Sequence, residues 1–515
     1  MAWLPRKPPN RVRELYAGGI MRFALAVVLA QPQHAQLERI VAQVHSLILF
    51  PGNTLLQTAL PFIMILNTFL AAALGAAASV SAAKSPARYA MYFDQYHTAA
   101  LPNKTMTAGI THVITAFANS SLFTSEPSGV YTPFQPLSDI RALFEQDVKL
   151  CMSIGGWGDT AGLSLGSKND TTRRLFARNV ASTLDRLGYD CVDIDWEYPG
   201  GNGADYKQIP NSKKKGEIAA YPHLLKELKK AIGTKELSIT VPGLERDMIA
   251  FTSAESPKIN EAVDFVTVMA YDLMNRRDTV TKHHTPVVGS LQAIDKYLSL
   301  GFSAEKLNLG FALYAKWFTT APGVDCSNGL GCRTALLENP DGSDTGASGA
   351  MTFEAANFHP PPTNLTIAPD ASCGAGTFHK CAEGSCCSQY GFCGDTSAHC
   401  GTGCQGGYGR CNGTSTLQSF YDAVSKSKTD EVQGGQWYWD SEGPFFWTFE
   451  TVDLIGRKFK EIYKARNLGG VSVWSLGEDS YDFELIKAIQ SGVKDSCGAS
   501  AKSTHVGRHQ RRSAH

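Results

Sequence analysis

Eight short apolar segments are spread along this chain from residue 89 onward, and they constrain its fold more than any other feature. Between them, apolar residues recur at helical spacing, as with Phe176, Val180 and Leu184. Strands that alternate with helices form parallel sheets, and eight such units predict a (β/α)8 barrel of the α/β class. The predicted strands are Tyr89–Asp94, Thr111–Phe117, Lys149–Gly155, Cys191–Glu197, Leu237–Pro242, Phe265–Tyr271, Leu307–Tyr314 and Gly470–Ser475.

The fourth of these segments carries a row of acidic side chains. Successive side chains of a strand point to opposite faces, so Cys191, Asp193, Asp195 and Glu197 share one face. Neighbouring carboxylates cannot all ionise, so a proton is shared and at least one pKa rises. A carboxylic acid kept protonated at the end of the strand, at Glu197, is suited to protonate the leaving oxygen of a glycoside. The alternative for this spacing is a structural acidic strand or a divalent-metal site.

The segment 190–197 (DCVDIDWE) resembles the DxxDxDxE signature of family 18 glycoside hydrolases, the chitinases, here of the fungal class V type. Three further segments resemble family motifs in the same order, namely SIGGW at 153–157, MAYD at 269–272 and GGVSVWS at 469–475. The sequence YAK at 314–316 departs from the usual Tyr-Gly-Arg of the family. The resemblance covers about residues 88–495, with one insert, and implies an active site at the C-terminal ends of the barrel strands.

The family resemblance implies a chitinase that cleaves β-1,4 linkages between N-acetylglucosamine units by substrate-assisted, retaining catalysis. In that chemistry Glu197 is the general acid and base, Asp195 holds the substrate's acetamido group, and Asp193 sets the charge of Asp195. Ser153 is expected to support Asp193. The resemblance assigns further catalytic roles to Tyr271 and Asp272, and substrate contacts to Trp474, Trp157 and Tyr198. It requires no metal and no organic cofactor.

The gap between the last two predicted strands, about 155 residues, is too long for a loop and predicts an inserted domain. Eight of the 13 cysteines lie in one part of this gap, between Cys373 and Cys411, in a Gly-rich segment with few aliphatic residues. A unit this small needs disulfides to fold, and a zinc cluster is the alternative. Eight cysteines allow many pairings, and the spacing alone selects none of them.

The segment 386–394 (CCSQYGFCG) resembles the hevein-type chitin-binding module. The resemblance implies a sugar-binding surface formed by Ser388, Tyr390 and Phe392, because aromatic faces stack on pyranose rings. His399 stands where the family usually has a further aromatic residue. The resemblance also implies four disulfides, Cys373–Cys387, Cys381–Cys393, Cys386–Cys400 and Cys404–Cys411.

The other cysteines allow separate expectations. Cys326 and Cys332 lie in a Gly-rich loop and are expected to form a local bridge. Cys151 and Cys191 lie on predicted strands, where we expect buried free thiols. Cys497 has no evident partner.

The N-terminal region differs from the rest of the chain. Residues 60–83 carry no charge and end in small residues, which is typical of a secretory signal cleaved near Ala82 or Ala83. Because 63 residues precede Met64, either Met64 is the true start or the segment is an uncleaved signal anchor. We expect a secreted, extracellular protein, in agreement with the many cysteines.

The predicted organisation has five parts. These are a signal peptide or anchor (1–83), the barrel (84–325 and 415–495), a linker (326–370), the hevein-like module (371–412) and a disordered basic tail (496–515). The net charge of +0 argues against a nucleic-acid partner. The expected partners are chitin and chito-oligosaccharides, with membrane contact only through an uncleaved anchor, and the expected state is a monomer. Two other functions stay open, an inactive chitin-binding lectin and an endo-N-acetylglucosaminidase on N-glycans.

Overall fold

The computed structural model describes residues 87–502, except 354–362, 375–376, 402–403, 412–415 and 481. The predicted signal or anchor segment, with Met64, Ala82 and Ala83, lies outside the described residues. Among the described residues, no helix combines the length and apolarity needed to span a membrane.

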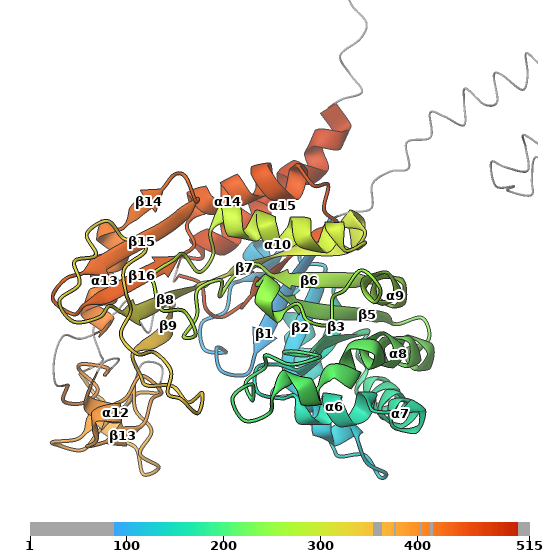
Figure 1. Ribbon diagram of the computed structural model, residues 1–515, viewed down its shortest axis with the longest axis horizontal. Coiled ribbons are helices and arrows are strands. Elements are labelled where there is room, and N and C mark those ends of the chain that lie inside the picture. The colour runs from blue at the N-terminus through green and yellow to red at the C-terminus, as the bar shows by residue number, and fades with distance from the viewer. Residues whose placement is uncertain are drawn as a thin grey trace, which may run out of the picture. The chain divides into compact units, whose positions relative to one another are not determined.

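Eight parallel strands close into a barrel in the spatial order β1-β17-β7-β6-β5-β4-β3-β2 (Figure 1). This confirms the predicted fold class. The strands begin and end within a few residues of the predicted bounds. They are β1 Arg88–Asp94, β2 His112–Ala118, β3 Lys149–Gly155, β4 Cys191–Asp195, β5 Glu236–Pro242, β6 Phe265–Met269, β7 Leu307–Ala312 and β17 Gly470–Trp474.

Helices follow most of these strands and cover the barrel from outside. The α-helices are α4 Lys104–Thr107, α5 Leu137–Ala142, α6 Ala161–Ser167, α7 Asp170–Leu187, α8 Lys215–Ile232, α9 Ser256–Ala262, α10 Val287–Ser299, α14 Val452–Lys458 and α15 Glu484–Lys502. The short helices are η1 Ser120–Phe123, η2 Asn211–Lys213, η3 Glu245–Asp247, η4 Ala304–Lys306 and the π-helical η5 Phe459–Lys464.

The helix α7 illustrates why these segments are helical. Asn169 caps its first turn by accepting hydrogen bonds from the amides of Thr171 and Thr172. Gly188 ends the helix with φ at 81°, a left-handed conformation that glycine adopts without strain. The helix buries Phe176 and Leu184 at the predicted positions.

The two faces of the barrel strands have opposite character. In β4, Val192 and Ile194 point outward and belong to the main apolar core under the helices. Cys191, Asp193 and Asp195 point into the barrel and are also buried. The barrel interior is therefore polar near the carboxyl ends of the strands, where a catalytic site is expected in this fold.

A second sheet interrupts the barrel between β7 and β17. Its order is β14-β15-β16-β8-β9, with β8 Tyr314–Thr319, β9 Ser348–Thr352, β14 Lys428–Asp430, β15 Gly435–Asp440 and β16 Phe445–Phe449, and α13 Thr416–Lys426 packs against it. Two predicted boundaries are therefore wrong, because β9 lies inside the expected linker (326–370) and the residues from 416 to 449 do not belong to the barrel. The aromatic strand pair β15 and β16 is held by antiparallel pairing with β8, a distant segment that local pattern does not reveal.

The cysteine-rich segment forms a small unit with little regular structure. It contains β10 Thr366–Ile367, β11 His379–Lys380, β12 Cys386–Cys387, β13 Cys393–Gly394 and α12 Ser397–Cys400. Its disulfides are Cys373–Cys387, Cys381–Cys393, Cys386–Cys400 and Cys404–Cys411, the same pairs that the hevein resemblance implies. These sulfurs form most of its interior, together with Tyr408. All eight cysteines are bridged, so they do not offer the thiolates that a zinc cluster needs.

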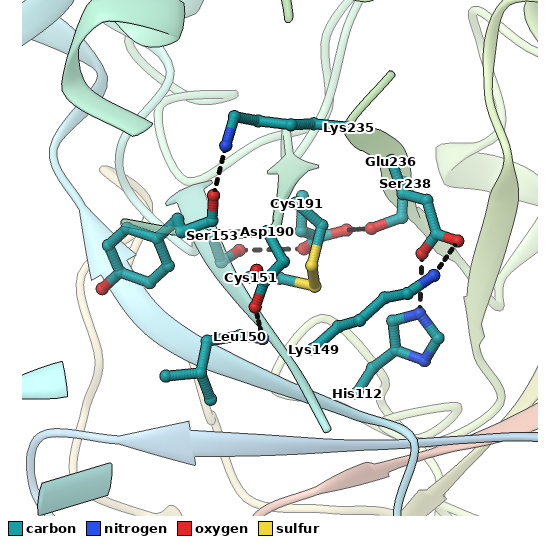
Figure 2. Close-up of a disulfide and its surroundings, with 12 residues drawn as sticks. His112, Lys149, Leu150, Cys151, Ser153, Asp190, Cys191, Lys235, Glu236 and Ser238 are labelled. Atoms are coloured by element: carbon teal, nitrogen blue, oxygen red, sulfur yellow. Dashed lines mark hydrogen bonds and ion pairs between the residues drawn. A yellow bond between two sulfur atoms is a disulfide. The ribbon is translucent and has the colours of Figure 1, made fainter. Parts of the chain in front are cut away.

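The expected free thiols at Cys151 and Cys191 are a wrong prediction, because the two residues form a disulfide (Figure 2). They face each other at the same register of β3 and β4, with their Cα atoms 4.3 Å apart. Both side chains point into the barrel, where strand pairing brings them within bonding distance. The expected local bridge between Cys326 and Cys332 is present.

The C-terminal helix also corrects the prediction, because α15 continues to Lys502, inside the expected disordered tail (496–515). Ile486 and Ile489 of this helix are buried in the core and hold its first turns in place. Once its first turns are packed, a helix continues by adding one hydrogen bond for each residue fixed, so it can end several residues past its last buried contact.

The barrel disulfide is expected to stabilise the fold more than the loop disulfide. Its cysteines are 40 residues apart, so the Cys151→Ala/Cys191→Ala variant should lose about 4 kcal/mol of unfolding free energy. The matched variant Cys326→Ala/Cys332→Ala opens a bridge across only 6 residues and should lose about 2 kcal/mol. Urea unfolding followed by tryptophan fluorescence measures both losses. An equal or larger loss in the loop variant would contradict the expectation.

Candidate active site

Asp193 lies in the centre of the barrel and is fully buried. Hydroxyl groups from three other strands donate to its carboxylate, with Ser238 Oγ at 2.7 Å, Ser153 Oγ at 2.9 Å and Tyr92 Oη at 3.1 Å. Thr240 Oγ1 lies 3.2 Å from the same group. Burial raises the pKa of Asp193, and these hydrogen bonds oppose that rise. The carboxyl group is therefore held in one orientation by four hydroxyl groups, of which sequence analysis named only Ser153.

Asp195 is the next inward residue of β4, and its environment differs from that of Asp193. It is only 3% exposed, and its Oδ1 atom has no hydrogen-bond partner among the described residues. Burial raises its pKa well above the usual value, and the nearby carboxyls of Glu197 and Asp193 raise it further. Asp195 therefore holds a proton readily and presents an unpaired oxygen that a ligand could contact.

Glu197 follows the end of β4 at the mouth of the barrel. Burial raises its pKa to about 7, the neighbouring charges of Asp272 and Asp247 add to this rise, and a hydrogen bond with Tyr198 and the charge of Arg277 oppose it. A carboxyl group with this pKa exchanges its proton close to neutral pH, as a general acid and base must. The three carboxyls thus have graded environments, from the hydrogen-bonded Asp193 to the titrating Glu197.

Tyr271 and Asp272 follow β6 and belong to a second group of contacts. Tyr314 Oη donates to Asp272 Oδ1 at 2.8 Å, and Lys316 Nζ lies 3.3 Å from Oδ2. Burial raises the pKa of Asp272, but Lys316, His284 and Tyr314 outweigh it and hold that pKa well below its usual value. Asp272 is consequently ionised at pH values below 7 at which Glu197 still holds its proton.

Three residues of this second group were not predicted as site residues. Tyr314 and Lys316 belong to the YAK segment that departs from the family pattern, and both serve Asp272. His284 Nδ1 lies 3.7 Å from Asp272 Oδ1, and burial lowers its pKa to about 4. The sequence signals for Tyr314 and Lys316 were their place at the family's Tyr-Gly-Arg segment and their alternation on one strand face, and neither indicates Asp272 as their partner.

Aromatic side chains form the apolar part of the site. The indole of Trp474, at the end of β17, stacks on Phe117 with ring centres 5.5 Å apart and lies 5.4 Å from the ring of Tyr92. Trp157 is 49% exposed, and its ring lies 6.3 Å from that of Tyr198. An exposed indole beside buried carboxyls is typical of a sugar-binding cavity.

A cavity of about 590 Å³ joins these groups. It is lined by eight of the predicted residues, namely Asp195, Glu197, Tyr271, Asp272, Trp474, Trp157, Tyr198 and, from the cysteine-rich module, Tyr390. The cavity lining does not include Asp193, Ser388 or Phe392. The structure therefore brings together most of the predicted site from four separate strand ends and one inserted unit.

The predicted module surface has exposed aromatic rings. Tyr390 is 58% and Phe392 is 56% exposed, so neither ring is part of a small core. Ser388 is buried, and its hydroxyl accepts a hydrogen bond from the Phe392 amide at 3.2 Å. Ser388 thus shapes the loop that carries the two rings.

One group of potential metal ligands lies beside the site. Asp94, His97 and Glu478 bring their ligand atoms within 4.8 Å of one another. His97 Nδ1 lies 2.9 Å from Asp94 Oδ1 and 3.5 Å from Glu478 Oε1. These contacts form an internal ion-pair cluster, and the mutual pairing gives no independent sign of a bound ion.

A family model described as glycosyl hydrolases family 18 matches residues 88–479 of the sequence. The chain belongs to this family. The match includes the eight barrel strands and the inserted units, so the carboxylate row and the disulfide of β3 and β4 lie within the matched residues. The match also spans the cysteine-rich module, which the description of the family model does not mention.

Curated relatives and solved structures agree with this membership. Chitotriosidase-1 of Mus musculus is 29% identical over 265 residues, which cover 47% of this chain and 55% of the relative. Sporulation-specific chitinase 2 of Saccharomyces cerevisiae is 27% identical and covers 39% and 42%. The chain thus spans about half the length of these curated relatives. A crystal structure of a chitinase from Rhizomucor miehei matches with a TM-score of 0.55 at 18% identity, covering 79% of this chain and 99% of that one, and shows the shared fold.

The raised pKa of Glu197 is expected to affect stability as well as chemistry. The folded protein binds this proton more tightly than the unfolded chain, so stability falls as pH rises from about 4.5 to about 7. Glu197→Gln removes the ionisable group, so above pH 7 the variant should be more stable than the parent, by on the order of a few kcal/mol. Near pH 4 the gain should vanish. Thermal unfolding at both pH values measures it.

The control for this measurement is Glu261→Gln, the same chemical change at an exposed position of α9. It should give no pH-dependent gain. A Glu197→Gln variant whose stability relative to the parent is the same at pH 4 and pH 8 would contradict the raised pKa.

Proposed function

We propose that this family 18 protein is a chitinase, which hydrolyses β-1,4 linkages between N-acetylglucosamine units with retention of configuration. The observation that carries the proposal is the position of Glu197. This carboxyl group lies at the wall of the cavity with its pKa raised to about 7, next to the buried Asp195. Relatives named chitinases support the substrate class. A structural neighbour, an Ostrinia furnacalis chitinase domain, is described in complex with a chito-oligosaccharide.

In the proposed reaction Glu197 gives its proton to the glycosidic oxygen as that bond breaks. The acetamido oxygen of the substrate forms a bond to the anomeric carbon and gives an oxazolinium ion. Glu197, now ionised, takes a proton from water as the oxygen of that water bonds to the anomeric carbon from the face that the leaving sugar occupied. The bond between the anomeric carbon and the acetamido oxygen breaks, which restores the acetamido group. The leaving sugar keeps the proton that it received from Glu197. The proton taken from water returns Glu197 to its acid form.

Asp195 is proposed to accept a hydrogen bond from the acetamido N–H through its Oδ1 atom. That atom is buried and without a partner among the described residues, so a ligand N–H at this position would satisfy it. Asp193 is held by four hydroxyls and would stabilise Asp195 as the proton between them moves.

The second group of contacts is proposed to hold the sugar that reacts. Tyr271 would donate its hydroxyl to the acetamido carbonyl and direct it at the anomeric carbon. Asp272, kept ionised by Lys316, would steady the distorted ring. Trp474 would form the apolar floor, and Trp157 and Tyr198 would contact the sugar beyond the scissile bond.

The hevein-like module and the disulfides fit an extracellular protein that acts on solid polymer. Six disulfides occur among the described residues, which favours an oxidising compartment and hence secretion. Binding of the module to insoluble chitin would raise the local concentration of substrate at the cavity. Neither the inactive lectin nor the endo-N-acetylglucosaminidase is favoured by an observation in the structure.

The first test of the proposal is hydrolysis of chitin oligomers by the parent and by Glu197→Gln. Loss of a general acid and base should lower kcat by about 10²-fold to 10⁴-fold. Binding to insoluble chitin should remain, and Glu261→Gln should keep the parent's activity. If the parent binds oligomers without cleaving them, the lectin function replaces the proposal. If it cleaves N-glycan cores and spares chitin oligomers, the endo-N-acetylglucosaminidase does.

The pH profile provides a second test. Glu197 must be protonated before reaction, so kcat/KM should fall as pH rises through about 7. Asp247→Asn removes a charge that raises this pKa, and it leaves the partner Arg277 free to lower the pKa further. The alkaline limb should therefore move to lower pH in this variant, while Glu261→Gln leaves it in place. A limb that does not move would contradict the assignment of this pKa to Glu197.

A further inference from the structure

The cysteine-rich module takes part in the wall of the catalytic cavity. Gln389 and Tyr390 line the same cavity as Asp195 and Glu197. In Figure 1 the module, marked by α12 and β13, lies below β8 and β9 of the second sheet. Binding to insoluble polymer alone does not require module side chains in this cavity, so their presence here calls for a separate explanation.

Close contacts join the module to the second sheet. Tyr390 Oη donates to Asp344 Oδ2 at 2.8 Å, in the segment that leads into β9. Gln389 lies against Gly349 of β9 so closely that a Cβ atom at this position would be 2.5 Å from Gln389 Oε1. The same Cβ atom would lie 2.8 Å from Trp317 Nε1, so a side chain at 349 would displace the end of the Gln389 side chain and press on the buried indole of Trp317.

A series of side-chain contacts also connects Tyr390 with Trp157 at the rim of the cavity. It runs from Trp157 to Tyr390 through Arg277, Tyr206, Glu338, Arg276 and Asp344. The Arg277 guanidinium lies 5.5 Å from the ring centre of Trp157. Arg276 Nε donates to Glu338 at 3.2 Å, and its Nη1 lies 4.0 Å from Asp344. The two exposed aromatic rings of the cavity thus belong to one connected wall.

We infer that Tyr390 and Gln389 form a sugar-contacting position of the catalytic cavity itself, so that one N-acetylglucosamine chain touches the module and Glu197 at the same time. The exposed ring of Tyr390 offers an apolar face to a pyranose, and the Gln389 amide offers a donor and an acceptor to its hydroxyl or acetamido groups. Phe392 is about equally exposed but does not line the cavity, so its ring is available to contact the surface of insoluble chitin. The inference rests on the proposed chitinase function.

The test compares Tyr390→Ala with Phe378→Ala, two deletions of exposed aromatic rings on the same module, using soluble N-acetylglucosamine oligomers. A soluble oligomer has no surface to which the module could anchor, so only a contact inside the cavity can affect its cleavage. Tyr390→Ala should lower kcat/KM for the hexamer roughly threefold to tenfold, the usual value of one aromatic contact. Phe378→Ala should leave this constant unchanged, because the Phe378 ring does not line the cavity.

Two further variants make the outcome decisive. Tyr390→Phe keeps the ring and loses the hydroxyl contact with Asp344, so it should keep most of the hexamer activity. If it loses as much as Tyr390→Ala, the contact with Asp344 carries the effect and the stacking inference is overturned. If Tyr390→Ala has the parent's kcat/KM for the hexamer, the module serves only as an anchor. If its kcat/KM is higher than the parent's, Tyr390 obstructs the cavity. Either result overturns the inference.

The affinity of the hexamer for Glu197→Gln, measured by calorimetry with and without Tyr390→Ala, separates this inference from the proposed function. If the parent is inactive but Tyr390→Ala still weakens hexamer binding threefold to tenfold, the chitinase proposal fails and the sugar-contacting position stands. If the parent is active and the affinity does not change, the proposal stands and the inference fails.

Discussion

The buried carboxylate of Asp193 is the constraint on which the rest of the site depends. A carboxyl group in the centre of a barrel is costly unless hydrogen bonds replace the lost water. Here four hydroxyls from β1, β3 and β5 converge on it, and their arrangement needs a closed barrel at one register. With Asp193 satisfied in this way, the next carboxyl, Asp195, is left without such donors and retains a proton. The high pKa of Glu197 then arises from its own burial and the charges around it.

The cavity separates two protonation states over a short distance. Glu197 titrates near neutral pH, whereas Asp272 is kept ionised by Lys316, His284 and Tyr314. Neighbouring titratable groups whose surroundings move their pKa values apart divide the roles of acid and charged stabiliser. Burial raises the pKa of Glu197, which follows β4, and the charge of Lys316 on β8 lowers the pKa of Asp272, which follows β6.

The local sequence pattern predicted the barrel well, because the periodicity of a strand or a helix depends only on residues that are close in the sequence. Motif resemblance also predicted that Trp474 and Trp157 belong with the carboxylate row, and these two indoles line the cavity with Asp195 and Glu197. The local pattern failed where distant segments meet. The second sheet depends on β8 pairing with β16, more than a hundred residues later, and the barrel disulfide depends on the register of two neighbouring strands. Neither pairing leaves a periodic signal in one segment.

By itself the sequence determined which residues could carry the chemistry and which segments could be strands, because residue type and spacing are local properties. The tertiary structure decided which hydroxyls hold Asp193, which cation keeps Asp272 ionised, and that Tyr390 of the module lines the cavity with Glu197. These are contacts between residues far apart in the chain. Their distances follow from the closure of the barrel and from the contact of Tyr390 with Asp344, and no local rule specifies either.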